Sequence, residues 1–205
     1  QKTFRNDFEI LNGPESPEVS IVELDREAII MMDRTDYLDM ETNYLETEIT
    51  SEDQEVTYKF QGYHLFQLAN AQVTAAQIQD GDADLAKEVW QVDLKDGITR
   101  LVNKEFDPEI GENLPILKVE GSDAGILHVI RLTDDAFASG NSKMINHKTY
   151  HYALIAYASA DEDNPGEDRQ YLTGRKVTQF SVTPRQTDIL FDGTKLKASY
   201  GDGPQ

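Results

Sequence analysis

The segment HKTYHYALIAYA, residues 147–158, constrains the fold most strongly because it is apolar on both of its faces. With the two-residue period of a strand, one face holds Tyr150, Tyr152, Leu154, Ala156 and Ala158, and the other holds His151, Ala153, Ile155 and Tyr157. A strand in a half-solvated antiparallel sheet alternates apolar with polar residues instead. We therefore expect this strand to run through a sheet that is covered on both sides.

The composition is that of a globular domain with an excess of acid. The 205 residues and 39% hydrophobic content allow a sizeable core. The formal net charge of -19 disfavours binding to nucleic acid or to an anionic membrane surface. Keeping the protein dispersed is the simplest role for this charge, and binding of divalent cations or life in a salty environment are the alternatives.

Cysteine and long apolar segments are both absent from the sequence. The lack of cysteine excludes disulfides, thiolate metal sites and a cysteine nucleophile. No apolar run approaches the roughly 18 residues of a membrane helix, so no membrane insertion is expected.

Turn-forming residues mark one domain with a connection at each end. Residues 1–16 finish in a segment rich in Gly, Pro and Ser, and residues 185–205 have little apolar content, so both are expected to be linkers. One domain is expected at residues 17–184. Because the chain begins with Gln1, we expect it to be a piece of a longer chain with flanking domains on both sides.

The apolar segments of this domain predict about seven antiparallel strands. Strands are expected at residues 18–24, 27–33, 57–68, 125–132, 147–158 and 175–184, and Asp96-Gly97 predicts a hairpin between residues 92–94 and 98–103. Gly62 interrupts the alternation of residues 57–68 and predicts a bulge. Strands of this number and length indicate an antiparallel β-sandwich.

One helical region is expected, at residues 69–95. Thr74 is a suitable N-cap for a turn over residues 75–78. The segment ADLAKEVW, residues 83–90, contains helix formers and places Leu85, Ala86, Val89 and Trp90 on one stripe. The acidic, interrupted segment 34–55 gives no comparable helical signal.

The order of these segments resembles a fibronectin type III domain. PEVSIVELDREAIIMMD resembles strands A and B of that family, GYHLFQL resembles strand C, NHKTYHYALIAYA resembles strand F, and KVTQFSVTP resembles strand G. The resemblance implies that Tyr63 and Leu65 point inward. It also places Tyr150 at the tyrosine corner, where the hydroxyl bonds a backbone group a few residues upstream.

Two departures from the family pattern define an enlarged form. Met32 stands where the family usually has tryptophan, and residues 69–124 form an insertion between strands C and E. We expect the insertion to pack on the sandwich through Leu85, Val89 and a largely buried Trp90, and to cover the outer face of strand F. This enlarged form is similar to domains of large surface proteins of bacteria that use type IX secretion.

The resemblance implies a mainly β, immunoglobulin or fibronectin type III-like β-sandwich with a small helical insertion. It also implies a non-catalytic spacer, scaffold or adhesive module of a secreted or cell-surface protein. The partners expected are flanking domains and a protein or glycan ligand. The alternative is an accessory carbohydrate-binding domain of a secreted enzyme, with Tyr37, Tyr44 and Tyr157 as candidate exposed rings, although aromatic residues in strands usually pack in the core.

No catalytic residues are expected, because the four histidines are scattered. His147 and His151 would lie about 13 Å apart on one strand, too far apart to share one metal ion. His64 and His128 are each alone in an expected strand.

Two acidic segments are candidates for calcium. QDGDADL, residues 79–85, fails as an EF-hand loop because Leu85 and Gln91 stand where Gly and Glu are required, so its acids are expected to cap a helix. DEDNPGED, residues 161–168, is a solvated loop or a weak site in which Asp161, Asp163 and Asp168 bind a calcium-like ion in preference to zinc.

Overall fold

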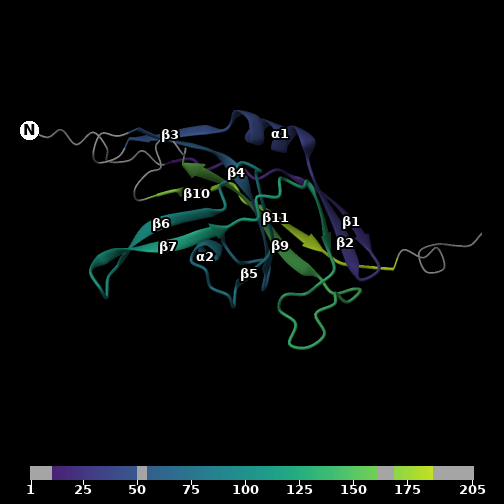
Figure 1. Cartoon of the computed structure of the whole chain (residues 1–205). Helices are drawn as coiled ribbons and strands as arrows, with labels where there is room; N and C mark the ends of the chain where they lie inside the picture. Colours follow the sequence, from purple (N-terminus) through teal and green to yellow (C-terminus); the bar gives the residue numbers. More distant parts are fainter. Residues whose placement is uncertain (1–10, 50–54, 161–168, 187–205) are drawn as a thin grey trace, which may run out of the picture.

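The computed structural model (Figure 1) describes residues 11–49, 55–160 and 169–186. The structure is mainly β, with antiparallel sheets, one of which curls like half a barrel. The described residues form eleven strands and two helices. Neither of these helices is long and apolar enough to cross a membrane.

A three-stranded sheet has the order β1-β2-β8. It consists of β1 (Val19–Leu24), β2 (Glu27–Met32) and β8 (Val129–Leu132). The turn at Asp25 and Arg26 joins β1 to β2 as expected, and Arg26 has a positive φ of 55°. The side chains of Ala28, Ile30 and Met32 share the buried face of β2.

A six-stranded sheet is built around two long central strands, β4 (Glu55–Leu68) and β9 (Tyr150–Ala160). The edge of β9 that faces away from β4 pairs with β10 (Tyr171–Thr173) near the end of β9 and with β11 (Thr178–Val182) near its start. The far edge of β4 pairs in the same way with β3 (Leu45–Ile49) and β5 (Ala86–Asp93). Both central strands are therefore paired on both edges over most of their length.

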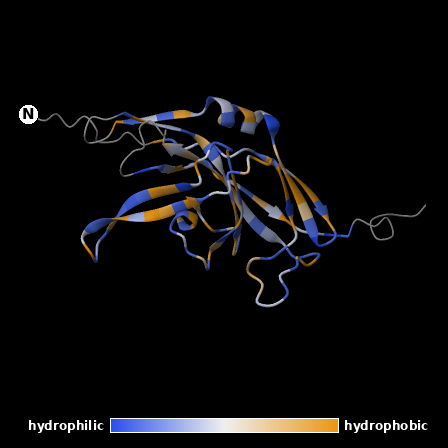
Figure 2. Cartoon of the chain, in the orientation of Figure 1, coloured by the Kyte–Doolittle hydropathy of each residue, from blue (hydrophilic) through white to orange (hydrophobic). Residues whose placement is uncertain are grey.

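The remaining elements are a two-stranded hairpin and two helices. We call the hairpin of β6 (Arg100–Asp107) and β7 (Glu112–Glu120) the arm, and both of its strands carry hydrophobic residues (Figure 2). Helix α1 (Arg34–Asn43) follows β2, and the short α2 (Ala75–Gln79) follows β4. Thr74 caps α2 through a capping box with Gln77, which confirms the cap expected from the sequence.

The main core cluster joins the two larger sheets. It contains Ile30 and Met32 of β2, Ile130 and Leu132 of β8, and inward side chains of β4 and β9. Tyr63 and Leu65 are fully buried in this cluster, as the sequence predicted. Tyr152, Leu154 and Ala156 supply the β9 side of it.

The outer face of β9 is covered by side chains from residues 69–124. Ala153 and Ile155 pack with Val73 and with Ile78 of α2. Further along the strand, Tyr157 packs with Leu101 and Val119 of the arm. The two apolar faces of the opening segment thus have separate cores, and covering by residues 69–124 is confirmed.

Gly62 forms the expected bulge. The pairing of β4 with β9 shifts register between Phe60 and Gly62. A Cβ atom at this position would lie 2.2 Å from the carbonyl oxygen of Val92 and 2.7 Å from the hydroxyl of Tyr157. Glycine is needed here because two neighbouring strands approach its backbone closely.

The helix expected at residues 83–90 is wrong. Residues 86–93 form strand β5, which pairs with β4 from Gly62 to Leu68. Leu85 packs on the outer cluster, whereas Val89 and Trp90 pack on the main core, and Trp90 is only half-buried. Pairing with β4, a long strand that also pairs with β9, outweighs the helical preference of Ala, Leu, Lys and Glu in this segment.

Helix α1 was not expected. Asp33 caps it by accepting hydrogen bonds from the backbone N–H groups of Thr35 (2.9 Å) and Asp36 (3.3 Å). None of its residues is buried, so the helix lacks the apolar stripe by which a helix is recognised in a sequence.

The hairpin expected at Asp96-Gly97 is also wrong. The turn exists, with Gly97 at a φ of 92°, but β5 pairs with β4 and β6 pairs with β7. Asp123 holds the turn by accepting hydrogen bonds from the N–H groups of Asp96 (2.8 Å) and Gly97 (2.9 Å). Strands β3, β7 and β10 were not predicted from the sequence.

Candidate functional site

A cleft of about 540 Å³ lies between the outer face of the six-stranded sheet and the arm. This volume falls in the range of about 300–1,000 Å³ that is usual for small-molecule sites. Its lining includes His64 and Phe66 of β4, Glu88 of β5, Asn103 of β6, Lys118 of β7 and Tyr171 of β10. We call it the arm cleft.

His64 is the buried polar residue of the arm cleft, with 3% of its surface exposed. Alternation along β4 places Tyr63 and Leu65 in the main core, and His64 and Phe66 therefore face outward. The pairing of β5 with β4 brings Glu88 to His64, with 2.8 Å between Nδ1 and Oε2. The imidazole ring centroid lies 4.5 Å from that of Tyr157.

Asn103 fixes the arm to β10 at the cleft. Its Oδ1 atom accepts hydrogen bonds from the backbone N–H groups of Gln170 (2.9 Å) and Tyr171 (2.8 Å). Its Nδ2 atom donates to the carbonyl oxygen of Tyr171 at 3.0 Å. These three bonds hold Tyr171 with its ring centroid 5.5 Å from that of Tyr157, and burial raises the pKa of the Tyr171 hydroxyl to about 12.

The charged side chains around the arm cleft are paired. Lys118 forms an ion pair with Glu105 across the arm, and His64 pairs with Glu88. Arg169 lies 4.0 Å from Glu48. Lys118 and Arg169 therefore each have a carboxylate partner.

A histidine bonded to a carboxylate is a component of acid–base catalysis, but it acts only on a substrate or nucleophile within hydrogen-bond reach. Within the described part of the chain, the side-chain hydrogen bond of His64 runs to Glu88 and to no hydroxyl group. The arrangement therefore places a histidine–carboxylate pair among the aromatic and polar side chains of the cleft.

Tyr150 makes the hydrogen bond expected of a tyrosine corner. Its hydroxyl oxygen accepts a hydrogen bond of 2.8 Å from the backbone N–H of Ile145, five residues upstream. Lys148 lies over the ring, with its Nζ atom 4.9 Å from the centroid. Tyr150 thus ties the start of β9 to the loop that precedes it.

Tyr63 connects the core to α1. Its buried hydroxyl donates to Oε1 of Glu41 at 3.1 Å, and the same carboxylate oxygen lies 2.8 Å from Nε2 of His128. Burial raises the pKa of the Tyr63 hydroxyl. Tyr37 stacks on His128 with 3.7 Å between ring centroids, so these four residues dock α1 on the sheets.

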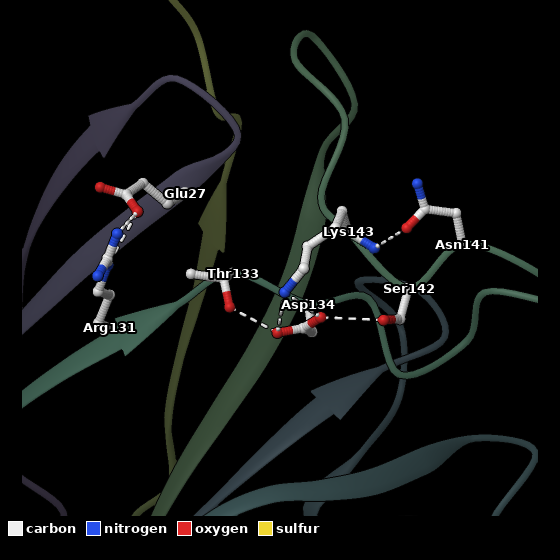
Figure 3. A network of polar contacts seen from close by, with 7 residues as sticks. All are labelled: Glu27, Arg131, Thr133, Asp134, Asn141, Ser142 and Lys143. Carbon is white, nitrogen blue, oxygen red and sulfur yellow. Dashed lines mark hydrogen bonds and ion pairs between the residues drawn. The ribbon is translucent and has the colours of Figure 1, made fainter.

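The loop before β9 is fixed by a polar network that the sequence did not indicate (Figure 3). The Asp134 carboxylate accepts hydrogen bonds from the hydroxyl groups of Thr133 and Ser142 and from the Lys143 ammonium group at 2.9 Å. These bonds hold the pKa of Asp134 at about 2. Glu27 and Arg131 form a separate ion pair across β2 and β8 in the same view.

The candidate calcium ligands Asp161, Asp163 and Asp168 lie outside the described residues. In the ranges that are described, no group of three or more His, Asp or Glu side chains is arranged to hold a metal ion. Asp82 accepts a hydrogen bond from the N–H of Asp84 at 2.9 Å in the turn before β5. The helix that these acids were expected to cap is a strand, so that expectation is wrong.

The four histidines occupy separate places. His147 has a positive φ of 65° and precedes β9, whereas His151 lies on β9 with Nδ1 2.8 Å from Oγ of Ser181. The sequence had placed His147 and His151 on one strand. This prediction is wrong, because His147 lies before the start of β9. His64 belongs to the arm cleft and His128 to the docking of α1.

The three candidate sugar-binding tyrosines do not form one platform. Tyr157 is fully buried, which contradicts its expected exposure. Tyr37 stacks on His128, and the Tyr44 hydroxyl donates to the carbonyl oxygen of Asn12 at 2.7 Å. The arm cleft was missed because His64, Glu88, Asn103 and Tyr171 come from four strands that no local sequence pattern connects.

Comparison with protein-family models, with curated proteins and with solved structures gives no match for this chain.

Proposed function

We propose that this chain is a non-catalytic structural or adhesive module of a secreted or surface-attached multi-domain bacterial protein. It is an immunoglobulin or fibronectin type III-like β-sandwich at residues 17–184, enlarged by the insertion at residues 69–124. It acts as a spacer or scaffold between flanking domains and offers its surface to a protein or glycan ligand.

The order of the strands carries this proposal. The segments that resemble strands A and B are β1 and β2, which pair with each other and with β8. The segments that resemble strands C, F and G are β4, β9 and β11, which are neighbours in that order. Separate A–B and C–F–G sheets are the arrangement of immunoglobulin-like sandwiches.

The path of the described chain supports a role as a spacer. The chain enters beside β3, where the N–H of Asn12 donates to Glu46 at 3.1 Å, and leaves beside β1, where the N–H of Arg185 donates to the carbonyl of Leu24 at 3.0 Å. These two places lie at opposite ends of the molecule (Figure 1).

The first and last described segments are also bonded side by side. Ser16 donates its N–H to the carbonyl of Lys176 and accepts at its own carbonyl from the hydroxyl of Thr178, both at 3.1 Å. Because Ser16 meets residues near 176 and Leu24 meets Arg185, the two segments run parallel. Tension applied to the two ends would act along these segments and shear the contacts between them. The hydrogen bonds would then have to break together and not one after another.

A screen for enzymatic turnover tests the non-catalytic part of the proposal. The purified chain should give no reproducible hydrolysis of ester, peptide, glycoside or phosphate substrates. Turnover that disappears in His64→Gln or Glu88→Gln, and persists in the matched variant His151→Gln, would overturn the proposal.

The alternative, an accessory carbohydrate-binding domain of a secreted enzyme, is favoured by the aromatic and polar lining of the arm cleft. The sequence that adjoins this chain in its parent protein separates the two roles. Further sandwich domains agree with a spacer, and a hydrolase domain agrees with the accessory role.

A further inference from the structure

The arm cleft combines an apolar floor with planar polar groups. Phe66 and Tyr171 supply aromatic rings, and Ile155 of β9 lies between their strands on the same face. Around them stand the carboxylates of Glu88 and Glu105, the amides of Asn103 and Gln79, and the guanidinium group of Arg169. Aromatic rings pack against C–H surfaces, and planar polar groups can form hydrogen bonds in pairs. Together they suit a ligand that is apolar on one face and rich in hydroxyl groups at its edges.

The ion pair of the cleft disfavours a strongly ionic ligand. The Lys118 ammonium group is held by Glu105, and the His64 ring by Glu88. An anionic ligand would compete with Glu105 for the Lys118 ammonium group, and a cationic ligand would compete with that ammonium group for Glu105. A neutral ligand meets neither penalty.

We propose that the arm cleft binds a short neutral oligosaccharide, with a sugar ring against Tyr171 and Phe66. Its hydroxyl groups exchange hydrogen bonds with Glu88, Glu105 and Arg169. This inference rests on the adhesive role proposed above and gives that role a ligand class and a place on the molecule. It also replaces the three tyrosines indicated by the sequence with a different set of residues.

Titration of the ¹⁵N-labelled 205-residue chain tests the proposal. The probes are neutral tri- to hexasaccharides of glucose, mannose, galactose and N-acetylglucosamine, at concentrations up to about 10 mM, with Kd values of about 1 mM or below expected for a fitting member. Amide shifts should change with the sugar at Gly81, Asn103 and Ile116, which line the cleft.

Two leucine variants distinguish the cleft from the rest of the surface. Tyr171→Leu keeps an apolar side chain but removes the ring, and affinity should fall at least about tenfold. Tyr37→Leu is the matched control, because Tyr37 stacks on His128 away from the cleft and its loss should leave affinity unchanged. Thermal unfolding of each variant shows whether it is folded, and shift mapping on the unmodified chain locates the site independently of both.

Four results would overturn the inference: no amide shifts with any neutral saccharide, shifts that map outside the cleft, equal losses in both variants, or preferential binding of acidic saccharides or peptides. These four results do not test the spacer role or the lack of catalysis, which are measured by unfolding force and by turnover. Conversely, hydrolysis of a bound sugar would contradict the proposed non-catalytic function and would still agree with the proposed class of ligand.

Discussion

Two tyrosines on the same face of β9 should respond in opposite ways to the loss of their hydroxyl groups. The Tyr150 hydroxyl accepts the N–H of Ile145 at 2.8 Å. The Tyr152 hydroxyl, two residues on, is buried and has no hydrogen-bond partner among the described residues. Both rings belong to the main core, so phenylalanine keeps the packing at each position. The contact of Lys148 with the ring of residue 150 is also kept.

Tyr150→Phe should lower the free energy of unfolding by about 1–2 kcal/mol, because a part-buried N–H loses its acceptor. Tyr152→Phe should be neutral or stabilising by up to about 1 kcal/mol, because an unpaired buried hydroxyl is replaced by an apolar edge. The hydroxyl also has its pKa raised by burial, in accord with a poorly solvated group.

Equilibrium unfolding in urea measures both variants against the unmodified chain, with equal m-values as the condition for comparing them. In a chain of this size, 1 kcal/mol corresponds to a shift in Tm of about 2–4 °C. A neutral Tyr150→Phe, or a Tyr152→Phe that is the more destabilising of the two, would contradict these roles of the two hydroxyl groups.

Three further changes test other parts of the structure. Gly62→Ala should cost about 3 kcal/mol or more, since the new Cβ would collide with the Val92 carbonyl, whereas Gly140→Ala, in open space, should be near neutral in the same unfolding assay. Trp90→Ala should cost about 1–3 kcal/mol, less than the 3–5 kcal/mol of a fully buried ring, because the side chain is half-buried; a zero effect in urea would contradict its packing on the main core. The pKa of Asp134 is lowered from 3.8 to about 2, so its contribution is complete above about pH 4 and is lost as the pH falls toward 2. Between about pH 4 and pH 2, the free energy of unfolding of Asp134→Asn should therefore fall less than that of the unmodified chain. Identical falls in both chains would contradict the network of Figure 3.

Strand patterns gave a sound guide where burial follows a local period. The alternation in β2, the alternation on either side of Gly62 in β4, and the two apolar faces of β9 were readable because each pattern lies within one strand. Gly62 and Thr74 were readable because each has a specific local role, as a bulge and as a cap.

Elements that depend on distant partners were not readable in this way. The segment 83–90 has helical composition, and only its pairing with β4 makes most of it a strand. The Asp96-Gly97 turn has the composition of a hairpin, yet Asp123 and the separate partners of β5 and β6 turn it into a connection between sheets. Helix α1 lacks an apolar stripe, and Glu41 docks it by polar contacts to Tyr63 and His128.

The proposed spacer role depends on the parallel contact between residues 16–24 and 176–185, and single-molecule pulling tests that contact directly. The chain should be stretched between marker domains attached at its two ends, which loads the bonds of Ser16 and Leu24 in shear. Because the chain has no cysteine, an Arg26→Cys attachment paired with the C-terminal end gives a matched geometry that peels the same bonds apart one after another. We predict a clearly higher unfolding force for end-to-end pulling than for peeling. An end-to-end force equal to or below the peeling force would contradict it.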